Sequence, residues 1–139
     1  MKLIIINGPN LNLLGTREPK IYGSQKFEVY LKKLRKLYPD STIEYYQSNI
    51  EGEIITVIQK SGFLFDGIIL NAGGYSHTSV AIADAIKAVK APVIEVHITN
   101  IFAREPARHV SLISQYVKGS ISGFGMDSYR LAVESFVKV

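Results

Sequence analysis

Runs of Ile, Val and other apolar residues alternate along the chain with stretches in which apolar residues recur every three or four positions. Each run is short and apolar at most positions, which is typical of strands buried on both faces of a parallel sheet. The strands predicted in this way span residues 2–7, 42–47, 67–71, 92–97 and 117–122.

The stretches between these strands predict helices, because residues three and four apart share one helical face. Gly62 follows the second stretch as a stop signal, and Pro106 holds a first-turn position that opens the fourth helix, with Val110 and Ile113 turned inward. The apolar positions that mark the other helices are Phe27, Leu31, Leu34 and Tyr38; Ile54, Ile55 and Ile58; Val80, Ala81, Ala85, Ile86 and Val89; and Tyr129, Val133 and Val137.

Five strand–helix units within 139 residues predict one α/β domain. The expected architecture is a flavodoxin-like three-layer sandwich, in which helices cover both faces of a five-stranded parallel sheet with strand order 2-1-3-4-5. Ligands of such sheets bind beyond the carboxyl ends of the strands. Functional residues are therefore expected at those ends.

Polar side chains gather where three of the predicted strands end. The first strand runs into residues 7–12, the third into 71–79 and the fourth into 95–100. These segments hold two of the three histidines, His77 and His97, beside amides and hydroxyls. Glu95 is expected to form a hydrogen bond near His97 or within the sheet edge.

The loop after the first strand, residues 8–23, is much longer than the ~2–6 residues that are usual for a connection between a strand and a helix. It carries Arg17, Glu18 and Tyr22 between Gly15 and Gly23. Long loops of compact domains often close over a site. Residues 16–23 are therefore predicted to form a mobile lid.

The two histidines and the segment 71–74 also have simpler interpretations. On one helix, His77 and Asp84 would share a face about 10 Å apart, too far for a direct hydrogen bond. Taken alone, His77 is more typical of a helix-capping residue than of a catalyst, and His97 fits both roles equally. Residues 71–74 lead to a helix expected near Ser79, where N–H groups would favour an anion, but a generic capping loop explains the same residues.

Composition and missing motifs exclude several kinds of functional site. The chain has no cysteine, which excludes disulfides and thiolate chemistry, and it has no His-x₃-His pair or carboxylate cluster, so no metal is predicted. It also lacks dinucleotide and Walker A motifs, so no nucleotide cofactor is expected.

The net charge is +4, but the densest basic cluster interleaves with Leu31, Leu34 and Leu37, which favours a solvated helix face over nucleic-acid binding. That cluster is Lys32, Lys33, Arg35 and Lys36.

The first apolar run is too short for a signal peptide, and no run reaches the ~18 apolar residues of a membrane helix. A cytoplasmic protein without membrane contact is the expectation.

In order along the chain, several segments resemble the type II 3-dehydroquinate dehydratase family. They are 7–15 (NGPNLNLLG), 17–19 with 21–23, 47–49 with 51–53, 71–84, 95–101 with Arg104, Glu105 and Arg108, and 119–125. Each segment is modestly specific, and together they span the chain. The resemblance implies a cofactor-free lyase that removes water reversibly, by trans elimination through an enolate, from 3-dehydroquinate to give 3-dehydroshikimate.

The resemblance also implies a role for each matching residue. Tyr22 is the implied proton acceptor and His97 the proton donor, Arg17 stabilises the transition state, and Asn10 holds a water at the enolate oxygen. The implied substrate-binding residues are Asn71, His77, Asp84, Ile98, Thr99 and Arg108. The implied assembly is a homododecamer, a tetramer of trimers, in which Asp84 reaches a neighbouring subunit's site.

The chain departs from the family pattern at three positions: Thr99 replaces a serine, Ala107 replaces an aromatic residue, and Ile50 replaces a frequent histidine. Other hypotheses fit less well. A flavin-binding module would need a phosphate loop after the first strand, and a receiver domain would need acids where Asn7 and Asn71 stand. An inactive relative is disfavoured because Arg17, Tyr22 and His97 are all present.

Overall fold

The computed structural model describes residues 1–16, 18–22 and 24–138. Five parallel strands form one sheet in the order β2-β1-β3-β4-β5, which confirms the predicted topology. The strands are β1 (Lys2–Asn7), β2 (Thr42–Gln47), β3 (Gly67–Asn71), β4 (Val93–His97) and β5 (Gly119–Ser122). Three have the predicted bounds, and β4 and β5 begin one and two residues later than predicted.

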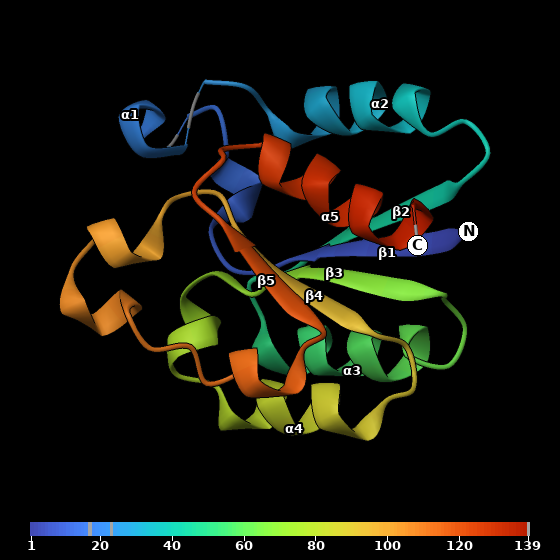
Figure 1. Cartoon of the computed structure of the whole chain (residues 1–139). Coiled ribbons are helices and arrows are strands. Elements are labelled where there is room, and N and C mark those ends of the chain that lie inside the picture. Colours follow the sequence, from blue (N-terminus) through green and yellow to red (C-terminus); the bar gives the residue numbers. More distant parts are fainter. Residues whose placement is uncertain (17, 23, 139) are drawn as a thin grey trace.

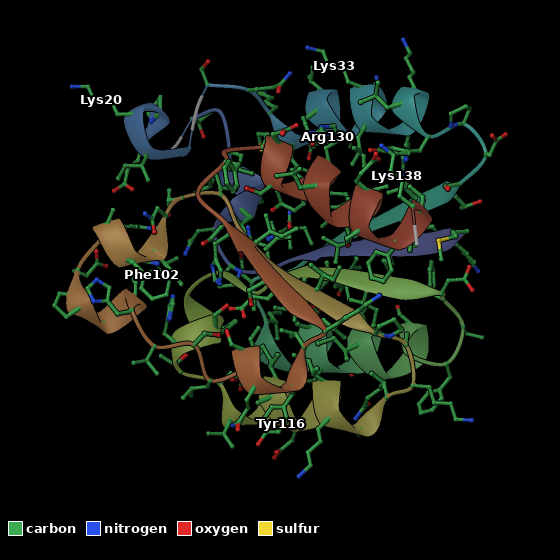
Figure 2. The ribbon with its side chains drawn as sticks, viewed as in Figure 1. Lys20, Lys33, Phe102, Tyr116, Arg130 and Lys138 are labelled. Carbon is green, nitrogen blue, oxygen red and sulfur yellow. The ribbon has the colours of Figure 1, made fainter. Side chains whose placement is uncertain are left out.

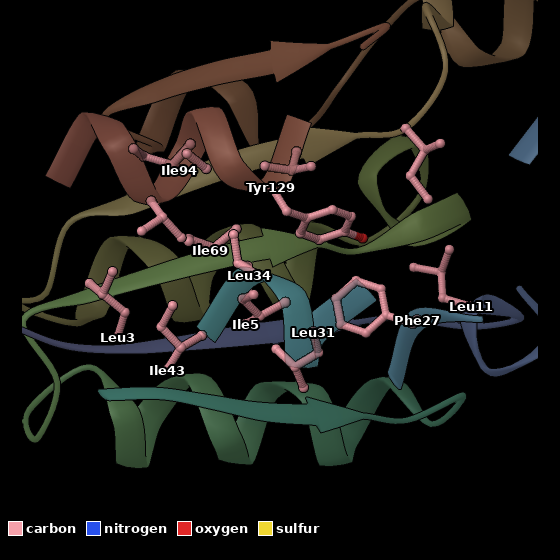
Figure 3. Packing of buried hydrophobic residues seen from close by; sticks show 14 of the residues in the cluster. Leu3, Ile5, Leu11, Phe27, Leu31, Leu34, Ile43, Ile69, Ile94 and Tyr129 are labelled. Atoms are coloured by element: carbon pink, nitrogen blue, oxygen red, sulfur yellow. The ribbon is translucent and has the colours of Figure 1, made fainter. Parts of the chain in front are cut away.

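Helices cover both faces of the sheet (Figure 1). Helices α2 (Phe27–Leu37) and α5 (Asp127–Val137) lie on one face, and α3 (Glu51–Ser61) and α4 (Val80–Ala88) lie on the other. Successive strand residues point to opposite faces, so Leu3 and Ile5 pack with α2 and α5 whereas Ile4 and Ile6 pack with α3 and α4. Figure 3 shows the first of these two core halves, in which the Phe27 and Tyr129 rings lie side by side.

Four of the five predicted helices are confirmed, with three local differences. Leu37, Val80 and Ala81 are exposed instead of buried. The basic residues of α2 are exposed, as expected of a solvated face. None of the helices in the described ranges has both the length and the apolar character of a membrane span.

The prediction of a helix that begins at Pro106 is wrong. The connection from β4 to β5 contains only 3₁₀ turns, namely η3 (Ile101–Ala103), η4 (Pro106–Arg108) and η5 (Ser114–Tyr116). Pro106 does start a turn and Ile113 is buried, but Val110 is exposed. The backbone of this connection forms hydrogen bonds with other segments; Leu112 N–H, for example, donates to the Ser76 carbonyl at 2.8 Å. A regular helix would need those groups for itself.

Residues 8–22 contain a 3₁₀ turn, η1 (Leu11–Leu13), and a single helical turn, α1 (Pro19–Tyr22). Helix α1 lies at the left in Figure 1, at the same end of the molecule as η3 and η4. Arg17 and Gly23 lie outside the described residues, as does the side chain of Tyr22.

Candidate active site

A pocket of about 110 Å³ lies at the carboxyl ends of β1, β3 and β4. It is lined by six residues that the sequence predicts for the site: Asn10, Asn71, His97, Ile98, Thr99 and Arg108. Lys20 of α1 and Phe102 of η3 mark this end of the molecule in Figure 2. The topology thus brings together residues that are up to 98 positions apart, from 10 to 108.

Strand β4 places Glu95 and His97 on the same side of the sheet, because they are two residues apart. His97 Nε2 lies 2.6 Å from Glu95 Oε1, and the two side chains are only 7% and 1% exposed. Burial opposes ionisation of Glu95, but hydrogen bonds from His97, Ser114 and Ser111 outweigh burial and lower its pKa to about 2. The carboxylate is therefore an acceptor, and the shared proton belongs to Nε2.

Because Nε2 bonds to Glu95, the second ring nitrogen of His97, Nδ1, can form a hydrogen bond with a bound molecule. Nδ1 makes no hydrogen bond within the described part of the chain, and the His97 ring lines the pocket. A protonated His97 could thus donate from Nδ1 to a bound molecule while Glu95 balances the charge of the ring.

Three serine hydroxyls complete the surroundings of Glu95. Ser111 donates to Oε1 at 2.7 Å, and Ser114 and Ser120 donate to Oε2 at 2.5 and 3.0 Å. Counting His97, the carboxylate accepts four hydrogen bonds. The sequence did not predict these serines, because they lie on separate segments and follow no period.

Asn71 is fixed at the end of β3 by a buried tyrosine. Its Oδ1 accepts from Gly73 N–H at 3.2 Å, so its Nδ2 must be the group that donates to Tyr129 Oη at 2.8 Å. The Tyr129 hydroxyl in turn donates to Asn7 Oδ1 at 2.8 Å. Tyr129 was predicted only as an apolar helix position, and its link to the site was missed.

Asn10 directly precedes η1 in a left-handed backbone conformation with φ of 69°, which asparagine tolerates better than most residues. Its N–H donates to Asn49 Oδ1 at 3.0 Å. The chain can reach this position because Gly8 packs against Ala72, the residue after β3, where an added Cβ would lie 2.5 Å from the Ala72 carbonyl oxygen. Residue 8 must therefore be glycine for Asn10 to stand at the pocket.

His77 does not lie on α4, so the expectation that it shares a helix face with Asp84 is wrong. It ends the 3₁₀ turn η2 (Gly73–His77), and Ser79 caps α4 by accepting from Ile82 N–H. The helix-capping interpretation of His77 is wrong for the same reason. Its ring stacks on His97 with centroids 5.9 Å apart.

The two nitrogens of His77 have different surroundings. Nδ1 lies 2.8 Å from the Val110 carbonyl, which can only accept, so Nδ1 carries the proton. Nε2 is buried and has no partner among the described residues. In the neutral ring Nε2 is an acceptor, so it can accept a hydrogen bond from a ligand hydroxyl.

Thr99 and Arg108 give the pocket its donors. Gly123 N–H and Gly125 N–H occupy the His97 and Ile98 carbonyls, whereas Thr99 N–H makes no hydrogen bond within the described ranges. Arg108 Nε donates to Glu105 Oε1 at 2.6 Å, which leaves its terminal NH₂ groups for a ligand. Arg104 lines the pocket as well. Two guanidinium groups beside a backbone donor suit a carboxylate.

Asp84 is exposed on α4 and does not line the pocket. Ile50, one of the three departures, also lies away from it, exposed at the start of α3. Across residues 1–16, 18–22 and 24–138, no three His, Asp or Glu side chains are grouped as metal ligands would be.

The sequence matches the profile of the family described as Dehydroquinase class II over residues 1–137. A 3-dehydroquinate dehydratase of Prochlorococcus marinus (strain NATL1A) is 49% identical over 139 residues, which cover 99% of this chain and 96% of that protein. One of Fusobacterium nucleatum is 53% identical over 138 residues, covering 96% and 94%. The crystal structure of type II dehydroquinase from Butyrivibrio crossotus aligns with a TM-score of 0.94 at 42% identity, covering 98% of this chain and 97% of that one.

Proposed function

Since this chain belongs to the class II dehydroquinase family, we propose that it catalyses the reversible dehydration of 3-dehydroquinate to 3-dehydroshikimate, a lyase step of the shikimate pathway, through an enolate. The observation that carries the mechanism is the buried His97–Glu95 pair in a pocket rich in hydrogen-bond donors. The family match leaves the flavin-binding and receiver-domain hypotheses without support.

His97 is the proposed general acid. Elimination expels a hydroxyl group, which leaves more easily when it receives a proton. Glu95 holds Nε2–H, so the proton that is transferred comes from Nδ1, the nitrogen with no partner in the described residues. After the transfer, His97 is neutral and still donates to Glu95 through Nε2. The acid thus keeps one orientation throughout the step.

Tyr22 is the proposed base and Arg17 its activator, although neither side chain lies within the described residues. A free tyrosine has a pKa near ~10, so it must be stabilised as the anion to remove a proton next to a ketone at neutral pH. A cation within ~4–6 Å can lower such a pKa by about 1–3 units. Arginine suits this role because it stays charged.

The remaining pocket residues would hold the substrate together with His77, which does not line the pocket but stacks on His97. We assign its carboxylate to Thr99 N–H, the Ile98–Thr99 turn and Arg108, and its hydroxyls to Asn71 and His77 Nε2. His77 Nε2 has no partner among residues 1–16, 18–22 and 24–138, which supports the second assignment. Asn10 would place a water at the enolate oxygen, where charge develops. The hydroxyl of Thr99 keeps the function of the serine that it replaces.

The proposed assembly is a homododecamer that works in the cytoplasm, with Asp84 completing a neighbouring subunit's site. Asp84 is exposed, and of the residues one turn away on its face Val80, Ala81 and Ala88 are exposed and apolar, whereas Lys87 is exposed and basic. Exposed apolar side chains beside a carboxylate fit a surface that another subunit covers. Light scattering of active fractions tests this, and a fully active monomer would refute both the assembly and the role of Asp84.

The direct test of the activity is ultraviolet absorbance after mixing with 3-dehydroquinate. The product is a conjugated enone that absorbs, whereas the substrate is not conjugated. We expect absorbance to rise with the wild-type protein and to rise far more slowly with His97→Ala. His77→Ala should weaken both binding and turnover. No change in absorbance with the folded wild-type protein would exclude the proposed function.

A further inference from the structure

The connection from β4 to β5 surrounds the Glu95 carboxylate with hydroxyl groups on the side away from the substrate pocket. Ser111 precedes η5, Ser114 is its first residue, and Ser120 belongs to β5. All three line a second pocket of about 370 Å³, and Glu95 and His97 line the same pocket. His97 lines both pockets, so the pair lies between the substrate and this hydroxyl-rich wall.

We infer that Ser111, Ser114 and Ser120 are positioning residues that set the acidity of the His97–Glu95 pair, so that His97 can release its proton. This inference rests on the proposed role of His97 as the acid. It is carried by geometry: three hydroxyls lie at 2.5–3.0 Å from a carboxylate that is 1% exposed. The serines touch neither the substrate pocket nor the reacting atoms.

The physical reason lies in what remains after His97 gives up its proton. The imidazolium compensates the buried carboxylate, but a neutral ring does not, and an uncompensated buried anion is unfavourable. The Glu95 side chain is 1% exposed, so water contributes little to its stabilisation and the hydroxyl donors supply most of it. Without them, the pair would retain its proton and His97 would be a weaker acid.

The low pKa of Glu95, about 2 despite burial, agrees with this view, because Ser114 and Ser111 are among the groups that lower it. Other titratable or charged groups also face the pair. His77 of η2 stacks on the His97 ring, His109 lines the second pocket, and Arg104 and Arg108 line the first. None of these is altered by substituting a serine, so the serine effect can be measured separately.

The test measures the titration of His97 by ¹⁵N NMR in histidine-labelled protein, with its signal identified by its loss in His97→Asn. In the double variant Ser111→Ala/Ser114→Ala, we expect the titration midpoint of the pair to rise by about one pH unit. The plateau kcat should fall about threefold, for a Brønsted coefficient near ~0.5. Ser120→Ala, whose hydrogen bond is the longest at 3.0 Å, should shift the midpoint less and in the same direction.

Two controls separate this role from a structural one. Ser114→Thr keeps the hydroxyl, and the adjacent pocket has room for a methyl group, so its midpoint should stay within about 0.2 pH units of the wild type. Ser122→Ala removes a hydroxyl from the same pocket that does not bond to Glu95, and it should change nothing. Ser114 and Ser120 are exposed residues, so their alanine variants are expected to fold.

A midpoint that is unchanged or lower in the double variant would overturn the inference, and so would an equal shift in Ser122→Ala. If Ser111→Ala/Ser114→Ala did not fold, Ser120→Ala alone would decide in the same way. The NMR midpoint does not depend on turnover. A failure of the proposed activity, seen as absent dehydration by wild-type protein, is therefore distinct from a failure of the serine role.

Discussion

Replacing Tyr129 with Phe should destabilise the protein and weaken substrate binding at the same time. The hydroxyl of this fully buried residue accepts from Asn71 Nδ2 and donates to Asn7 Oδ1, both at 2.8 Å. Phenylalanine keeps the ring packing against Phe27 but leaves both amide groups without that partner. A buried polar group without a partner costs about 1–3 kcal/mol, so we expect a loss of about 2–4 kcal/mol in the free energy of unfolding.

Tyr30 provides a matched control in the same aromatic cluster, with its ring centroid 6.2 Å from that of Tyr129. Burial raises the pKa of Tyr30 to about 12, despite the nearby backbone N–H of Arg130, and its hydroxyl has no hydrogen-bond partner in the described part of the chain. Tyr30→Phe removes an unpaired polar group. Its free energy of unfolding should therefore change by less than about 0.5 kcal/mol or increase.

Urea unfolding of the two variants measures the difference, and steady-state kinetics add a second reading. Because Tyr129 fixes the Asn71 amide at the pocket, Tyr129→Phe should raise KM for 3-dehydroquinate, whereas Tyr30→Phe should not. Equal stability of Tyr129→Phe and the wild type would refute the network as described. A normal KM with reduced stability would show that Asn71 keeps its orientation without the tyrosine.

Three further predictions follow from the site and its support. Tyr22→Phe should nearly abolish turnover while substrate binding persists, and a kcat near that of the wild type would remove Tyr22 as the base. Glu95, whose pKa falls from 4.5 to about 2 because hydrogen bonds outweigh burial, should contribute about 3 kcal/mol of stability that is complete above about pH 4.5 and lost as the pH falls towards 2. Urea midpoints measured from pH 2 to 5 should accordingly depend less on pH in Glu95→Gln than in the wild type. Gly8→Ala should lower the melting temperature, because its Cβ would meet the Ala72 carbonyl at 2.5 Å, whereas Gly52→Ala on α3 meets nothing within 4 Å and should stabilise by up to ~1 kcal/mol.

Much of the fold could be predicted because local pattern and burial agree. The strands are apolar on both faces, and parallel strands with crossover helices leave few topologies to choose from. The prediction failed between β4 and β5, where Val110 and Ile113 have helical spacing but the backbone bonds reach across to η2. Such long-range partners have no signal in local periodicity.

The residues of the candidate site also fall into those that the sequence could predict and those that it could not. His97, Asn71 and Thr99 could be predicted because each stands at the end of a strand, where the topology determines its place. Ser111, Ser114 and Tyr129 could not, because their importance comes from a partner far along the chain. The shared helix face of His77 and Asp84 was a wrong premise, since a 3₁₀ turn and the Ser79 cap come between them.

The hydrogen bond from Tyr129 to Asn7 joins residues that are 122 positions apart in the sequence. At synthesis rates of about 5–20 residues per second, Asn7 is made roughly 6–24 s before Tyr129. During that interval β1 and β3 can pair, but Asn71 has no tyrosine to hold it. Helix α5 must therefore be synthesised before the substrate pocket acquires its final shape, so a nascent chain that lacks this helix should bind substrate more weakly even when most of its sheet has formed.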